Sequence, residues 1–240
     1  MVNQKLIKMP VLNHLICYLI SYIGLVLFYI LFDRILNLFP SFSSVDSDSA
    51  LIITYCMAYG FTAISLIIYL WNSVLREIVN QFKVLKNILT GIEFGVVLIV
   101  GTIVIQIIVS QIANMVNLPV NPNDNEDNIR RGTISQPILS ALMSIIFAPF
   151  TEEIGYRLGI FGGISKYNRV GAYIVTALFF SLIHFNFESE NIINELFNLP
   201  SYIFAGAWLC FCYDYNGSIA TSITAHMFNN LVAFVLTFIE

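Results

Sequence analysis

The sequence carries very little charge for its length. Asp, Glu, Lys and Arg together make up 11% of the 240 residues, whereas a soluble domain typically carries about 25%. Hydrophobic side chains make up 58%. A soluble fold of this composition could not cover its surface with polar groups, but a membrane protein needs no such cover because lipid surrounds it. The missing charge therefore excludes an ordinary soluble domain and predicts an all-α polytopic membrane protein.

Basic residues and cysteines are also scarce. The 11 lysines and arginines form no cluster, which argues against nucleic acid as a partner. The partner expected from the composition is the lipid bilayer. The four cysteines all lie inside apolar runs. Cys210 and Cys212 are two positions apart and point about 200° away from each other on a helix, so a disulfide or a shared metal between them is disfavoured. We expect all four to be small packing residues.

Long apolar runs predict about seven transmembrane helices, since one span takes about 20 residues. The three spans predicted first cover 14–32, 50–71 and 88–116, with an amphipathic connector at 72–87. A hydrophilic loop is expected at 117–136 and another at 188–199. The four spans predicted last cover 137–164, 170–187, 200–213 and 219–239. Because nearly all ionisable residues inside spans fall in the second group, we divide the chain into a transmembrane scaffold at 1–136 and a functional core at 137–240.

The basic residues indicate how the chain lies in the membrane. With the N-terminus inside, the segments on the cytoplasmic side contain Lys5, Lys8, Arg76, Lys83, Lys86, Lys166 and Arg169. The segments on the outer side contain Arg34, Arg130 and Arg131. Cytoplasmic loops carry the excess of Lys and Arg in membrane proteins. The sequence therefore predicts a multi-pass protein of the cell membrane with a cytoplasmic N-terminus.

The fourth predicted span contains three charged residues, Glu152, Glu153 and Arg157. A charged side chain near the bilayer centre costs at least about 2.5–3.5 kcal/mol, so such residues face a bundle interior or a water-filled cavity and are functional candidates. Glu153 and Arg157 are four positions apart and share a helix face, which predicts an ion pair. Glu152 is rotated about 100° from Glu153 and lacks such a partner. The unmatched carboxylate is therefore the better candidate for general acid–base chemistry.

Two histidines lie in other predicted spans. His184 is in the fifth, and His226 is in the seventh, four positions before Asn230. An imidazole and an amide on one helix face can donate hydrogen bonds to the same point, which is what a developing oxyanion requires. One membrane histidine alone could simply pack or bond to a neighbouring helix. Together with Glu152, the two histidines and the amide favour a functional site.

These residues form a pattern of three short motifs in a fixed order. They read EExxxR for 152–157, FxxxH for 180–184 and HxxxN for 226–230. In this order on separate membrane helices, they resemble the CAAX protease and bacteriocin-processing family, also called Abi, which includes type II CAAX prenyl proteases and bacteriocin self-immunity proteins. The resemblance covers roughly 137–240, and the first three helices resemble generic scaffold.

The resemblance implies an intramembrane endopeptidase acting on a peptide or protein substrate in the membrane. By this analogy, Glu152 activates the attacking water with help from His184, while His226 and Asn230 stabilise the oxyanion. Glu153 and Arg157 would give structural support. Family members have been viewed both as metalloproteases and as glutamate-dependent proteases. Glu152, His184 and His226 could hold a divalent metal such as zinc, but there is no HExxH motif, and we favour catalysis without a metal.

Two other functions remain open at this point. Buried carboxylates and histidines also relay protons in coupled transporters, although the two halves of this chain show no repeat of the kind that many carriers have. A non-catalytic membrane partner, such as an immunity protein that works by binding, could keep the motifs for structure. One geometric difficulty also arises: the predicted boundaries place Glu152 about 20 Å below the outer face and His184 about 5 Å below it, yet the two must meet.

Overall fold

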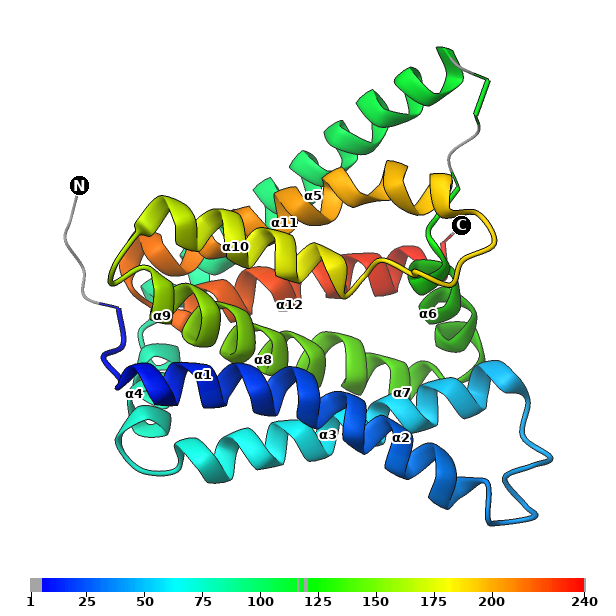
Figure 1. Ribbon diagram of the computed structural model, residues 1–240, viewed down its shortest axis with the longest axis horizontal. Coiled ribbons are helices and arrows are strands. Elements are labelled where there is room, and N and C mark those ends of the chain that lie inside the picture. The colour runs from blue at the N-terminus through cyan, green and yellow to red at the C-terminus, as the bar shows by residue number, and fades with distance from the viewer. Residues whose placement is uncertain (1–5, 116, 119–120, 240) are drawn as a thin grey trace.

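Long helices running side by side make up the protein, as the ribbon of the computed structural model shows (Figure 1). The structure describes residues 6–115, 117–118 and 121–239. Within these residues the regular elements are all helices, so the predicted all-α fold is confirmed. Six of the helical segments are long and apolar enough to cross a membrane, and one apolar helix is shorter. The chain is therefore a multi-pass membrane protein.

The six long segments follow the predicted spans in order. The first and the fourth include stretches of π-helix, labelled η. The bounds are Val11–Leu36 (α1 Val11–Leu19, η1 Ile20–Gly24, α2 Leu25–Leu36), α3 Ser47–Leu70, α5 Leu85–Met115, Pro137–Ile164 (α7 Pro137–Ala141, η2 Leu142–Phe147, α8 Ala148–Glu153, η3 Ile154–Phe161, α9 Gly162–Ile164), α11 Ile192–Asn216 and α12 Ile219–Leu236. The shorter apolar helix is α10, Arg169–Leu182, and the amphipathic connector contains α4, Ser73–Phe82.

Two segments that the sequence predicts as loops contain helix. Helix α6 spans Asp124–Ser135, inside the expected loop 117–136. Its cap is Asn123, whose side chain accepts a hydrogen bond from the Glu126 amide. Three acidic residues in its first turn stabilise the helix by interacting with the positive end of its dipole. Helix α11 begins at Ile192, capped by Asn191, and carries Pro200 in its interior. The prediction of a loop at 188–199 is therefore wrong from 192 onward, because polar caps and tertiary bonds outweigh the hydrophilic composition.

The segment Pro137–Ile164 is the most buried of the six. It lies close to α1 and η1 because glycines face that contact: a Cβ at Gly155 would lie 2.5 Å from the Cβ of Ser21, and one at Gly159 would lie 3.1 Å from the His14 carbonyl oxygen. Small residues allow membrane helices to approach in this way. The N-terminal helices thus pack directly on the segment that carries Glu152 and Glu153.

Helix α10 ends at Leu182, five residues before the predicted end of the fifth span at 187. Its 14 residues rise only about 21 Å, which is less than the hydrocarbon thickness of about 30 Å. His184 lies two positions beyond the end of this helix and is half-buried in the bundle. The depth difference expected from the sequence boundaries does not exist in the structure.

Candidate active site

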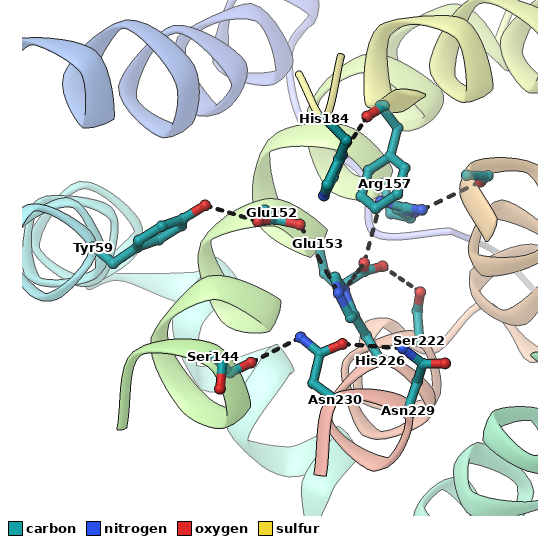
Figure 2. A network of polar contacts seen from close by, with 12 residues as sticks. Tyr59, Ser144, Glu152, Glu153, Arg157, His184, Ser222, His226, Asn229 and Asn230 are labelled. Carbon is teal, nitrogen blue, oxygen red and sulfur yellow. Dashed lines mark hydrogen bonds and ion pairs between the residues drawn. The ribbon is translucent and has the colours of Figure 1, made fainter. Parts of the chain in front are cut away.

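Helix α8 places two adjacent carboxylates in the middle of the bundle. Glu152 is 7% exposed and Glu153 is fully buried. π-helical stretches lie on both sides of α8, and such stretches are frequent at functional sites because they reorient side chains within a helix. Figure 2 shows side chains from α3, from the segment 137–164, from the end of α10 and from α12 pointing toward this pair.

Glu153 is the centre of a buried polar network. Its Oε1 lies 3.1 Å from Nη1 of Arg157 and accepts a 2.9 Å hydrogen bond from Nδ1 of His226. Its Oε2 accepts a hydrogen bond from the Ser222 hydroxyl. The ion pair expected from the four-residue spacing is therefore present, with both side chains fully buried.

Arg157 is held on its other side as well. Its Nη2 donates to the carbonyl oxygen of Gly206 on α11 at 3.2 Å, and its guanidinium carbon lies 4.5 Å from the ring centre of Phe180. Such cation–π contacts are strongest away from water. The pair with Glu153 thus connects three membrane helices.

Glu152 has different surroundings. Its Oε1 accepts a 3.0 Å hydrogen bond from the hydroxyl of Tyr59 on α3. Its Oε2 lies 3.9 Å from Nε2 of His226, which is too far for a hydrogen bond. Sequence reasoning did not find Tyr59, because one tyrosine in an apolar run gives no signal. The two glutamates are adjacent, but only Glu152 keeps an oxygen without a hydrogen-bond donor among the described residues.

His184 is oriented by its own helix end. Its Nδ1 contacts the carbonyl oxygen of Phe180 at 2.9 Å. A carbonyl only accepts, so Nδ1 carries the proton and Nε2 of the neutral ring is an acceptor. The ring stacks on Tyr202 with centres 4.5 Å apart, and Nε2 points toward Glu152 (Figure 2). The Phe180 ring lies next to both imidazoles, 4.9 Å from His184 and 6.1 Å from His226.

The backbone that carries His184 is held by buried polar side chains from two other segments. Asn123 donates from Nδ2 to the His184 carbonyl oxygen at 3.1 Å. Glu195, 1% exposed on α11, accepts from the Asp124 amide at 2.9 Å and from the Asn186 amide at 3.1 Å. These bonds pair one backbone amide at the start of α6 and one in the segment after α10.

His226 and Asn230 lie one turn apart on α12, as the sequence predicts. Nδ1 of His226 faces a carboxylate and therefore carries a proton, so its Nε2 can donate only when the ring is doubly protonated. Asn230 donates from Nδ2 to the Ser144 carbonyl oxygen at 2.8 Å and accepts from Nδ2 of Asn229 at 3.1 Å. One of the two N–H groups on Nδ2 remains for another acceptor.

A metal site requires several of these groups to converge, as zinc takes three or four protein ligands. In the part of the chain that the structure describes, no group of three or more His, Cys, Asp or Glu side chains is placed to hold a metal ion. Nδ1 of His184 and Nδ1 of His226 are both used in hydrogen bonds, so Nε2 is the atom through which either ring could bind a metal. In this arrangement Glu152, His184 and His226 do not make up a metal site.

Comparison with known proteins agrees with the motifs. Residues 134–232 match the family model described as Type II CAAX prenyl endopeptidase Rce1-like. We refer to this stretch, which is similar to that family, as the Rce1-like domain. Its bounds include all three motifs, so the resemblance inferred from the sequence is confirmed. The Rce1-like domain contains every candidate residue except Tyr59 and Asn123.

A similar curated protein comes from Mycoplasma capricolum subsp. capricolum and has no function in its name. It is 23% identical over 228 residues, which cover 89% of this chain and 64% of the relative. The chain thus spans less than two thirds of the relative's length. The similarity extends beyond the Rce1-like domain into the N-terminal helices. No solved structure matches the chain.

Proposed function

We propose that the chain is an intramembrane endopeptidase that cleaves a membrane-associated protein or a peptide precursor. The observation that supports this most is the buried carboxylate of Glu152, with one oxygen bonded to Tyr59 and the other 3.9 Å from His226. A buried, partly unpaired carboxylate beside two imidazoles is a suitable general base. The Rce1-like domain around it agrees with proteolysis.

In this proposal Glu152 activates water. Its Oε2 takes a proton as the water oxygen attacks the carbonyl carbon of the scissile peptide bond, and the same proton then passes to the leaving amine as the C–N bond breaks. His184 orients the water, because its Nε2 accepts the second hydrogen of that water. The bond from His184 Nδ1 to the Phe180 carbonyl fixes this tautomer.

The negative oxygen that forms during attack needs donors. Nε2 of a doubly protonated His226 and the free N–H of Asn230 supply them in this proposal. A positive His226 also balances the buried charges, because Glu152 and Glu153 are then matched by Arg157 and His226. Buried charges persist when they are paired in this way.

We propose that this reaction uses no metal, because no step above requires one. Preincubation with a strong chelator should leave the cleavage rate unchanged. If the chelator abolished cleavage and zinc restored it, catalysis without a metal would be contradicted. The roles of the other site residues would then have to be tested again with a metal at Glu152.

The orientation and the compartment are part of the proposal. With the N-terminus in the cytoplasm, Lys166 in the turn after α9 and Arg169 at the start of α10 also lie inside, at the same end of the bundle as α4 (Figure 1). A cysteine introduced at Tyr167, which is 78% exposed, should react with a membrane-impermeant thiol reagent only after cells are opened. Labelling in intact cells would reverse the orientation.

The decisive experiment compares peptides from cells that express the wild-type protein or Glu152→Gln at equal abundance. Mass spectrometry should find new termini in membrane and secreted peptides with the wild type and none with Glu152→Gln. Glu93→Gln is the matched control, because Glu93 is an exposed carboxylate on a different membrane helix, α5. Equal termini in all three strains would contradict the proposal and favour a binding or transport function.

A further inference from the structure

Helix α3 reaches the candidate active site although it lies outside the Rce1-like domain. Tyr59 on α3 donates from its hydroxyl to Oε1 of Glu152 at 3.0 Å. The two residues are 93 positions apart. Among the described residues, this is the hydrogen bond that the Glu152 carboxylate receives, and Figure 2 shows the phenol approaching it from the side opposite His226.

The ring of Tyr59 is fixed by its packing. It lies against a buried cluster that contains Ile52, Cys56 and Met143. Helix α3 packs against η2 next to this ring, since a Cβ at Gly60 would lie in van der Waals contact with the Phe147 ring at 3.5 Å. A rigid aromatic ring with one polar end is well suited to hold a buried partner in place.

The bond restricts what Glu152 can do. A glutamate has several rotatable bonds, and its carboxylate could otherwise turn toward His226 or away from it. With Oε1 held by a phenol, Oε2 is left toward His226 at 3.9 Å. A hydrogen bond to a charged group is about twice as strong as a neutral one, so this contact determines the orientation.

We propose that Tyr59 is a positioning residue of the active site, which holds Oε1 of Glu152 so that Oε2 faces the water and the scissile bond. This inference rests on the proposed function, because it assigns Glu152 as the base. It also means that the N-terminal helices are part of the catalytic apparatus and not scaffold alone.

The experiment uses the full chain in lipid nanodiscs and two matched variants. Tyr59→Phe removes only the hydroxyl. Tyr55→Phe removes a phenol one turn away on the same helix, and its ring lies 6.4 Å from that of Tyr59. The infrared difference between wild type and Glu152→Gln isolates the carboxylate bands of Glu152, and these bands respond to hydrogen bonding without any substrate.

The expected result is a shift of the Glu152 bands in Tyr59→Phe and none in Tyr55→Phe. With a synthetic peptide spanning a bond cleaved in cells, kcat should fall about tenfold or more in Tyr59→Phe while KM stays unchanged. Unshifted bands would show that the contact is absent. Shifted bands with unchanged kcat would overturn the positioning role, and a wild-type protein that cleaves nothing would overturn the proposed function instead.

Discussion

Glu153 and His226 are joined by a hydrogen bond of 2.9 Å that connects the segment Pro137–Ile164 to α12. The same carboxylate oxygen also lies 3.1 Å from Arg157. One buried carboxylate thus neutralises a guanidinium and sets the tautomer of an imidazole. Sequence spacing suggested only the first of these two roles, since His226 is 73 positions away.

Removal of this charge should destabilise the protein. Glu153→Gln leaves the fully buried Arg157 unpaired, and breaking a buried pair typically costs about 3–5 kcal/mol. We expect a large decrease in thermal stability in detergent. The double variant Glu153→Gln, Arg157→Met removes both charges and should be more stable than Glu153→Gln alone. A single variant as stable as wild type would show that the pair contributes nothing to the fold.

Asn230→Ala should slow catalysis without unfolding the protein. Loss of one oxyanion donor typically lowers kcat by about 100–1,000-fold, and KM should change little because the donor acts on charge that forms in the transition state. Asn229→Ala serves as the control, because Asn229 only donates to Asn230. Its effect should be much smaller. Equal losses in the two variants would assign Asn230 a purely structural role.

The membrane helices could largely be predicted from the sequence, because long apolar runs in a chain with little charge have few other solutions. The ion pair of Glu153 with Arg157 follows from helix periodicity alone. Helix α6 was missed because its stability depends on the Asn123 cap and on contacts with α3 and α7. Tyr59 was missed because its partner lies 93 positions away.

The depth of His184 could have been predicted with a different reference point. Glu152 and His184 lie on either side of the turn that follows Ile164 and precedes Arg169. Measured from that turn, a rise of 1.5 Å per residue places Glu152 about 18 Å and His184 about 22 Å into the bundle. The span boundaries predicted on the outer side placed Glu152 and His184 far apart. The end of the fifth span was set at the polar residues after His184, but these residues do not mark the membrane surface. The segment after His184 is bonded to α11, because the Asn186 amide donates to Glu195 and the Asn191 side chain accepts from the Asn194 amide.

Glu195→Gln tests whether this buried loop positions His184. The change weakens an acceptor that serves two backbone amides, Asp124 and Asn186, and weakening such bonds typically costs about 1–3 kcal/mol. We expect faster hydrogen exchange at both amides together with reduced cleavage. Glu188→Gln on the exposed part of the same loop is the control. Normal exchange and normal activity in Glu195→Gln would show that the contacts with Phe180, Tyr202 and Asn123 hold His184 without Glu195.

Close packing between η3 and the first span can be tested by a compensating pair of substitutions. A Cβ at Gly155 would lie 2.5 Å from the Cβ and 2.7 Å from the hydroxyl oxygen of Ser21, so Gly155→Ala should force the helices apart. Overpacking of this kind typically costs about 1–3 kcal/mol.

Ser21→Gly removes both atoms that the new methyl group would meet. Thermal stability should therefore fall in Gly155→Ala and recover in part in the double variant. A loss that Ser21→Gly does not reduce would mean that the methyl group meets a different neighbour. Because η3 directly follows Glu153, the same double variant should also recover cleavage, which would connect the packing of the first span to the geometry of the site.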